Sequence, residues 1–218
     1  MSPRRLVLVR HGESVWNVER RVQGHECRGL TDVGHTQAAR TGAALARQLA
    51  ADEDGDAPVR LVTSDLGRCR DTAAPIAAAL GVAAHVDATL RERSFGRWEG
   101  MTRAELEADD ADRYARWRTG ADVIAEVGGE SDATLRTRAA AAFARLLGDD
   151  DAGGTVVAVT HGGTIWYGLH ALLGLDAYRF GQVRNASVSE LVVGARGPAG
   201  LDPALPQLVR FNETSHLG

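Results

Sequence analysis

Residues 4–17 read Arg-Arg-Leu-Val-Leu-Val-Arg-His-Gly-Glu-Ser-Val-Trp-Asn, and this stretch decides the fold. The apolar run at 6–9 is bounded by arginines and rich in residues that favour strands, a pattern typical of a strand buried on both faces. Arg10, His11 and Gly12 follow it directly. Ligands of open α/β sheets bind beyond the carboxyl ends of the strands, so these residues are the first candidates for function.

The same alternation of apolar runs and helical periodicity continues along the chain. Strands are expected at 6–9, 59–63, 83–86, 155–159, 187–193 and 207–211, and helices at 31–49, 64–80, 131–148 and 161–173. Thr31 can cap the first helix, Ser64 or Asp65 can cap the second, and Gly81 can end it. Alternating strands and helices predict a three-layer α/β/α fold with a mostly parallel central sheet.

The length favours one domain. A chain of 218 residues can bury a single large core, and we find no repeat or linker in its sequence. Polar helical patterns at 102–118 interrupt the alternation. We therefore expect a single domain over 1–218, with a helical excursion at about 101–130 that lies near the active site.

Composition limits the chemistry and the partners. The formal net charge is −4, which argues against a broad surface for nucleic acid or anionic membrane. All 25 cationic residues are arginine, which excludes a Walker-type phosphate loop and a Schiff-base lysine. Cys27 and Cys69 form no zinc or redox motif, and the apolar run at 6–9 is too short for a signal peptide or a membrane span. We expect a cytoplasmic protein.

Three strand ends carry residues suited to an anion. His11 follows the first strand, Ser64 and Arg68 follow the second, and His161 with Gly162 follows the strand at 155–159. Helix amino termini after Ser64 and Gly162 add backbone N–H donors and a favourable dipole. Arginine binds phosphate oxygens with a planar fork, so the pattern indicates a phosphate site.

Six ordered blocks over nearly the whole chain carry a family resemblance. They are Leu8-Val9-Arg10-His11-Gly12-Glu13-Ser14 with Asn17, Gln23 and Gly24, then Leu30-Thr31 with Gly34, Gln37 and Ala38, then Ser64-Asp65-Leu66 with Arg68, Thr72 and Ala73, then Glu92-Arg93 with Phe95-Gly96 and Trp98-Glu99-Gly100, then Gly129-Glu130-Ser131, and finally His161-Gly162-Gly163. These blocks resemble the histidine phosphatase superfamily, and the resemblance implies a phosphoglycerate mutase-like fold. Gly29 and Cys69 depart from the family's usual Pro and Ala at positions expected to be structural.

The resemblance implies a role for each site residue. His11 is the nucleophile that takes the phosphoryl group, and Arg10, Arg68 and His161 clamp its oxygens. Glu92 is the general acid and then the general base, with Glu99 as its nearest rival. Residues expected to bind substrate are Asn17, Gln23, Gly24 and Gly162. No metal and no organic cofactor is implied.

The implied function is hydrolysis of a small phosphate ester, and alternatives remain. A cofactor-dependent phosphoglycerate mutase shares the phosphohistidine step. However, the interval 92–161 is shorter than the resemblance implies for a mutase, and the sequence motifs around Trp98 and Gly162 resemble the phosphatase branch better. A non-catalytic protein that binds a phosphate ligand is the remote alternative. The substrate is not determined, and oligomeric state is open, a homodimer included.

Several residues near the blocks have competing interpretations. A serine hydrolase with Ser14 or Ser64 as nucleophile is disfavoured, because neither residue lies in a Gly-x-Ser-x-Gly elbow. A zinc site made of His11, His25 and His35 is disfavoured as well, because their spacing is unlike that of common metal motifs. Two further hypotheses concern larger sets. Tryptophans 16, 98 and 166 either line the pocket or anchor the core, and arginines 113, 116 and 118 either meet an anionic substrate tail or lie on a solvated helix face.

Overall fold

The protein folds around one six-stranded sheet. In the computed structural model, residues 4–26, 28–51, 57–148, 154–175, 181–194 and 204–218 are described. The strands are β1 (Arg4–Arg10), β2 (Val59–Thr63), β3 (Ala84–Val86), β4 (Gly154–Thr160), β5 (Val188–Val193) and β6 (Gln207–Glu213), in the order β3-β2-β4-β1-β5-β6. The first four are mutually parallel, while β5 and β6 are antiparallel to their neighbours. The predicted fold class is confirmed, with every expected strand present.

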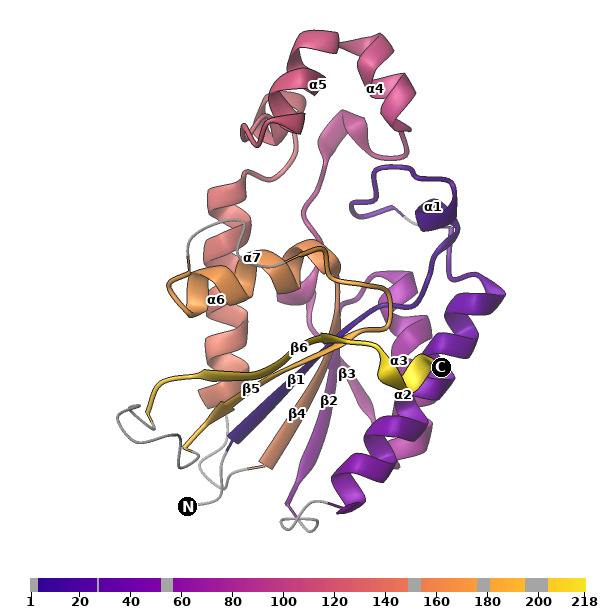
Figure 1. Ribbon diagram of the computed structural model, residues 1–218, viewed down its shortest axis with the longest axis vertical. Helices are drawn as coiled ribbons and strands as arrows, with labels where there is room; N and C mark the ends of the chain where they lie inside the picture. The colour runs from indigo at the N-terminus through magenta and orange to yellow at the C-terminus, as the bar shows by residue number, and fades with distance from the viewer. Residues whose placement is uncertain (1–3, 27, 52–56, 149–153, 176–180, 195–203) are drawn as a thin grey trace.

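Helices cover both faces of the sheet (Figure 1). The helices in the described part of the chain are α1 (Val15–Val18), α2 (Asp32–Ala51), α3 (Gly67–Leu80), α4 (Arg103–Asp109), α5 (Ala111–Arg118), α6 (Asp132–Gly148) and α7 (Gly162–Leu172). Of these, α2 and α3 cover one face of the sheet and α6 and α7 cover the other. Short 3₁₀ turns occupy Ala88–Leu90, Gly96–Trp98, Ile124–Val127 and Ser215–Leu217. No helix in the described ranges is long and apolar enough to cross a membrane.

Strand β1 shows why the sheet is buried on both sides. Leu6 and Leu8 point to the face covered by α6 and α7, whereas Val7 and Val9 point to the face covered by α2 and α3. All four side chains are fully buried, as alternation along a central strand requires. The apolar run therefore joins the two halves of the core.

Two helix starts test the capping predictions. Thr31 precedes α2 and its hydroxyl accepts a hydrogen bond from the Gly34 N–H at 3.0 Å, as predicted. The prediction that Ser64 or Asp65 caps α3 was wrong, because that helix begins at Gly67 after Leu66, which makes no side-chain cap. The Ser64 hydroxyl bonds mainly to His161, and Asp65 is paired with Arg91.

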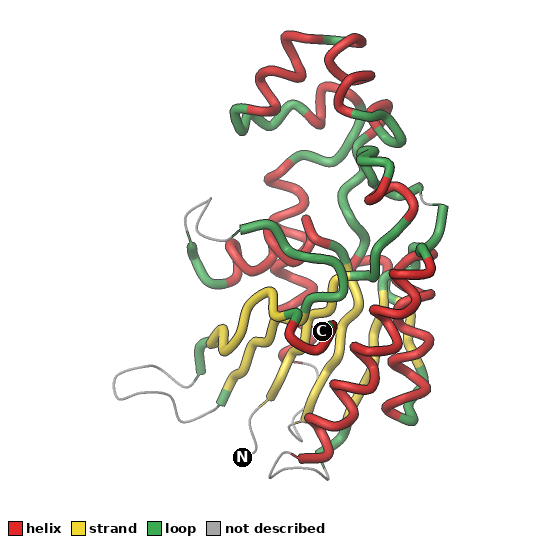
Figure 2. Tube along the Cα trace, turned by 45° about the vertical axis from the view of Figure 1, so that its right-hand side comes forward, coloured by secondary structure: helices red, strands yellow, loops and turns green. Residues whose placement is uncertain are grey.

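The helical excursion carries a core of its own. Helices α4 and α5 lie at the top of Figure 1, away from the sheet, and Figure 2 shows the same separation from another side. The buried members of this core are Trp98, Leu106, Tyr114, Val123, Ile124 and Val127. Gly96 has a φ of +56°, and a Cβ there would lie 2.1 Å from the Val127 carbonyl oxygen. The segments around Gly96 and Val127, at the two ends of the excursion, therefore pack backbone against backbone.

Candidate active site

The sheet order brings three strand ends together. Strand β4 lies between β1 and β2. The His11 N–H donates to the Thr160 carbonyl at 3.0 Å, and the Ser64 N–H donates to the Val159 carbonyl at 2.9 Å. His11, Ser64 and His161 therefore leave adjacent strands at one edge, as expected for an open α/β sheet.

Backbone contacts hold the His11 ring in one tautomer. The ring is buried, and its Nδ1 lies 2.8 Å from the Gly12 carbonyl oxygen. Because a carbonyl can only accept, Nδ1 carries the proton and Nε2 of the neutral imidazole is unprotonated. The Gly12 N–H donates to Thr72 Oγ1, and a Cβ at Gly12 would lie 2.5 Å from the Gly34 carbonyl oxygen. The loop that carries His11 therefore requires glycine at position 12.

Electrostatics keep His11 neutral. Burial first, and then the charges of Arg68 and Arg10, hold the pKa of His11 well below its usual value of 6.5. Burial also lowers the pKa of Arg10 to about 10, so that guanidinium stays charged at neutral pH. The site thus combines an uncharged imidazole with two cations.

The second histidine is engaged by its neighbours. His161 is fully buried, its Nε2 lies 2.9 Å from Ser64 Oγ, and its Nδ1 accepts from Arg68 Nε at 3.2 Å. Burial and then the Arg68 charge hold the pKa of His161 well below 6.5. Arg68 also donates through Nη2 to the Gly24 carbonyl at 2.8 Å. Arg68 is therefore fixed between His161 and the loop that contains Gly24.

Glu92 and Glu99 have different surroundings. Glu92 accepts from the Gly163 N–H at 2.9 Å, at the start of α7. A Cβ at Gly163 would lie 2.3 Å from Glu92 Oε1, so glycine is needed for this approach. Glu99 accepts from the backbone N–H groups of His25 and Phe95 at 2.9 Å each, which ties two loops together. Glu92, unlike Glu99, lines the cleft described below.

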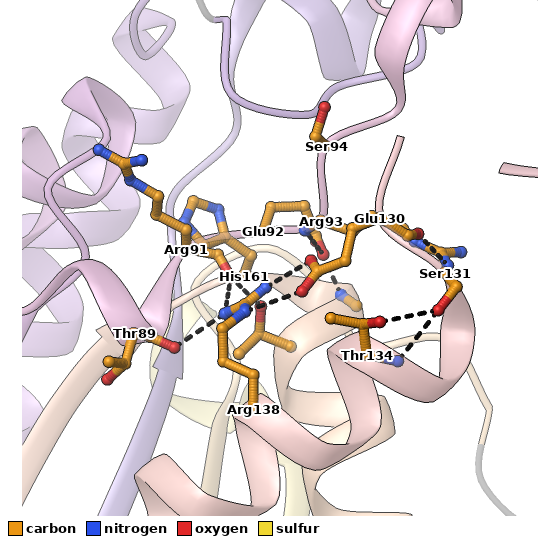
Figure 3. Close-up of polar contacts among 12 residues, drawn as sticks. Thr89, Arg91, Glu92, Arg93, Ser94, Glu130, Ser131, Thr134, Arg138 and His161 are labelled. Atoms are coloured by element: carbon orange, nitrogen blue, oxygen red, sulfur yellow. Dashed lines mark hydrogen bonds and ion pairs between the residues drawn. The ribbon is translucent and has the colours of Figure 1, made fainter. Parts of the chain in front are cut away.

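Arg138 positions the backbone that leads into Glu92. It donates to the carbonyls of Thr89 and Arg91 at 2.8 and 3.0 Å, and forms an ion pair with Glu130 at 2.7 Å. Figure 3 shows the Arg138 side chain reaching from α6 toward these partners. Fixing the residue before Glu92 limits the positions that the carboxylate can take.

A cleft of about 860 Å³ opens over the strand ends. Its lining includes seven predicted site residues, namely Arg10, His11, Asn17, Gln23, Arg68, Glu92 and Gly162. The two other predicted residues, Gly24 and His161, contact Arg68 instead of appearing in this lining. The structure thus gathers all nine predicted residues into one site, with Gly24 and His161 supporting it.

Other residues in the site were not predicted from the sequence. The lining also contains Arg93, Trp117, Asp132, Arg136 and Tyr167. Asn185 donates to the carbonyls of His11 and Gly12 at 3.1 and 3.2 Å. Arg93 belongs to a quoted block and could have been found there, whereas the others resemble ordinary polar or core positions.

The structure does not support the hypothesis that arginines 113, 116 and 118 of the excursion meet an anionic substrate tail. Arg113 and Arg116 form ion pairs with Glu126, Arg118 lies over the Tyr114 ring, and none of the three lines the cleft. Their charges are used within the excursion itself.

The tryptophans divide between cleft and core. Trp166 lines the cleft, whereas Trp16 and Trp98 are buried and absent from its lining.

Within the described ranges no group of three or more His, Cys, Asp or Glu side chains is arranged to hold a metal ion, and His35 is exposed on α2.

Comparison with known proteins gives consistent matches. A family model described as "Histidine phosphatase superfamily (branch 1)" matches residues 6–202. Glucosyl-3-phosphoglycerate phosphatase of Mycobacterium tuberculosis is 35% identical over 201 residues, covering 88% of this chain and 86% of that protein. A Klebsiella pneumoniae protein named probable phosphoglycerate mutase is 37% identical over 187 residues, covering 84% of this chain and 82% of its own.

A solved structure supports the same assignment. Mycobacterial glucosyl-3-phosphoglycerate phosphatase in complex with VO3 superposes with a TM-score of 0.77 at 30% identity, covering 97% of this chain and 100% of that one. The match of the family model extends over most of the chain and includes both histidines at the strand ends. This chain therefore belongs to branch 1 of the histidine phosphatase superfamily.

Proposed function

We propose that this enzyme hydrolyses a small phosphate monoester, with His11 as the nucleophile. The observation that carries the proposal is the tautomer of His11, whose Nδ1 proton is held by the Gly12 carbonyl while Nε2 keeps its lone pair. Nε2 would form a bond to phosphorus as the ester P–O bond breaks. The leaving alkoxide takes a proton from Glu92, which then accepts one from the water that releases orthophosphate.

The charged groups around His11 suit phosphoryl transfer. Arg10 and Arg68 line the cleft beside His11, and their guanidinium groups would bind the equatorial oxygens. His161 reaches the same oxygens only after exchanging one of its present partners, so we assign its first role to the orientation of Arg68. Gly162 would add a backbone N–H at the start of α7.

Asn17 and Gln23 complete the proposed phosphate site. Asn17 Oδ1 accepts from Asn185 at 2.9 Å, and its Nδ2 lies 3.4 Å from Gln23 Oε1. Gln23 is held in turn by Ser14 at 2.9 Å. These contacts orient two amide groups at the cleft wall, while Gly24 contributes by its carbonyl bond to Arg68.

The proposal is tested by phosphate release from a panel of phosphorylated metabolites. We expect release from at least one monoester, and no requirement for added bisphosphoglycerate. Isomerisation of 3-phosphoglycerate is measured in parallel because one relative is named a probable mutase. Isomerisation without release would establish the mutase alternative. If the protein catalysed neither release nor isomerisation, the non-catalytic alternative would be favoured.

We expect the acid limb of kcat/KM to depend on Arg68. Since its charge helps to lower the pKa of His11, the wild type keeps a neutral nucleophile below pH 6.5. Arg68→Gln removes that charge, so the acid limb should move to higher pH, and activity should fall roughly 10²- to 10³-fold from the lost clamp. The measurement is kcat/KM from pH 4 to 8 with one substrate.

A matched variant separates local from general charge effects. Arg145→Gln removes a cation that pairs with Asp87, outside the cleft lining. Its acid limb should coincide with that of the wild type, because the charges that lower the pKa of His11 are those of Arg68 and Arg10. The substrate phosphate titrates in the same way in all three assays. Equal limbs for Arg68→Gln and the wild type would remove Arg68 from the control of His11.

The setting of the reaction belongs to the same proposal. We place the enzyme in the cytoplasm with a small phosphate ester as its partner, and without nucleic acid, membrane or cofactor. The arginine-only cation set and the net charge of −4 support this, and the Cys69 thiol is buried. A homodimer is compatible with the proposal and is not needed by it.

A further inference from the structure

The loop before β5 lies against the nucleophile. Strand β5 runs antiparallel to β1 and lies beside it in the sheet (Figure 1), so the residues that precede β5 continue alongside the residues that follow β1. Two backbone bonds extend this pairing. The Arg10 N–H donates to the Ser187 carbonyl at 3.1 Å, and the Ala186 N–H donates to the His11 carbonyl at 3.1 Å. The segment 184–187 is therefore fixed beside His11.

Asn185 uses its side chain to contact three groups of the site. Its Nδ2 donates to the carbonyls of His11 and Gly12 at 3.1 and 3.2 Å, and to Asn17 Oδ1 at 2.9 Å. An amide NH2 has two hydrogens, so at least one of them is shared between two of these acceptors. Asn185 is half-buried and is not among the described residues that line the cleft. It therefore acts on other protein groups and not on the substrate itself.

The Gly12 carbonyl is the first group that Asn185 restrains. This oxygen also accepts the Nδ1 proton of His11, at a distance of 2.8 Å from Nδ1. The peptide that carries the oxygen is held at both ends, because the Glu13 N–H donates to Gln37 Oε1 at 2.8 Å and the carbonyl accepts from Asn185. Glycine at position 12 gives this peptide freedom to rotate. The Asn185 bond therefore restrains the acceptor that fixes the His11 tautomer.

The Asn17 amide is the second group that Asn185 restrains. Its Oδ1 accepts from Asn185 Nδ2 at 2.9 Å and from the Ser14 N–H at 3.1 Å. Its Nδ2 lies 3.4 Å from Gln23 Oε1, and both of these residues line the cleft. Ionised phosphate oxygens only accept hydrogen bonds, so they require the NH2 end of the Asn17 amide. By holding the oxygen end, Asn185 keeps the NH2 end available to the phosphoryl group.

The backbone of this segment has supports other than the Asn185 amide. The Arg184 N–H donates to Asn212 Oδ1 at 2.7 Å, and Asn212 Nδ2 donates to the Gln182 carbonyl at 2.8 Å. The backbone bonds to the end of β1 depend on no side chain. Removal of the Asn185 amide should therefore leave the segment in place. Asn212 supports the same segment from β6 and is not among the described residues of the cleft lining, which makes it a control.

We infer that Asn185 is a positioning residue, whose single amide group holds the Gly12 carbonyl against the His11 ring and turns the Asn17 amide toward the phosphate. The inference rests on the proposed phosphatase function and adds a residue to it. The alignment of His11 Nε2 with phosphorus then depends on Asn185. Rates of group transfer depend steeply on alignment, whereas binding of the phosphate depends mainly on the two guanidinium groups of the site.

Asn185→Leu tests this assignment, because leucine keeps the branched shape of asparagine and has no donor. We expect kcat for the best monoester of the panel to fall about 10- to 100-fold, with KM raised by no more than about threefold. Asn185→Ala makes no steric demand and should show the same pattern, so the measurement remains possible if the leucine variant does not fold. A loss that lies wholly in KM, or a kcat within about twofold of the wild type, overturns the inference.

The tautomer of His11 is read from nitrogen NMR spectra of protein labelled at its histidine side chains, without substrate and with His11→Ala to assign the signals. The wild type should show a protonated Nδ1 and an unprotonated Nε2. In Asn185→Leu, part of the population should carry the proton on Nε2, and unchanged His11 signals overturn the inference. Absence of phosphate release by the wild type would reject the proposed function, whereas these spectra still decide whether Asn185 fixes the tautomer.

A double-mutant cycle tests the contact with Asn17. The variants are Asn17→Ala, Asn185→Leu and their combination. Since Asn185 acts partly through Asn17, the combined loss in kcat/KM should be smaller than the product of the two single losses. Losses that multiply independently overturn the inference.

Asn212→Gly is the control for general loosening of the segment. Asn212 has a φ of +56°, which glycine adopts readily. The variant loses the side-chain support of residues 182 and 184, so its urea midpoint should fall while kcat stays within about threefold of the wild type. A loss of kcat equal to that of Asn185→Leu would assign the effect to the whole segment and overturn the inference.

Discussion

His11→Ala should abolish phosphate release, with a loss of roughly 10⁴-fold or more in kcat, because the reaction loses its nucleophile and has no substitute within the cleft. His161 cannot replace it, since Arg68 and Ser64 occupy both of its ring nitrogens. The measurement is orthophosphate release on the best substrate of the panel. Protein quenched in alkaline detergent should carry an acid-labile, base-stable phosphoryl label only in the wild type.

A surface histidine provides the control for this substitution. His35 is exposed on α2 and is absent from the cleft lining, so His35→Ala should keep full activity and the full label. Urea unfolding of both variants checks that the fold survives. If His11→Ala retained more than about a hundredth of the wild-type rate, the nucleophile would have to be another group.

Glu92→Gln should lose roughly 10²- to 10⁴-fold in kcat on alkyl phosphates, because the leaving alkoxide is no longer protonated. p-Nitrophenolate leaves without a proton, so the first step should persist with p-nitrophenyl phosphate. Attack by water still needs the base, and we expect a burst of about one p-nitrophenol per protein followed by a slow phase. Rapid-mixing absorbance measures both phases.

Glu99→Gln is the matched control, since it makes the same change at the rival carboxylate. Glu99 accepts backbone N–H bonds from His25 and Phe95 rather than lining the cleft. Its substitution should lower stability by about 1–3 kcal/mol through weakened loop anchoring, with equal effects on alkyl and aryl phosphates. A burst in Glu99→Gln and none in Glu92→Gln would exchange the two assignments.

Local pattern predicted the elements because strands and helices reflect near neighbours in the chain. The run at 6–9 became the centre of β1, and the helix predicted at 131–148 is α6, in which Leu135 and Leu147 are buried. The start of α3 could not be predicted in the same way. Ser64 is a good cap by its chemistry, yet its hydroxyl is used by His161, which lies 97 residues away.

By itself, the sequence determined the fold class and the convergence of His11, Arg68 and His161, because strand ends in a parallel sheet meet at one edge. The family and the role of Glu92 came from the resemblance of the ordered blocks. Only the tertiary structure decided which side chains are already paired. Arg93 and Asp132 resemble ordinary polar positions in the sequence, and the ion pair between them, across 39 residues, is seen only in the fold. Such pairing depends on distances between elements far apart in the chain, which local pattern does not encode.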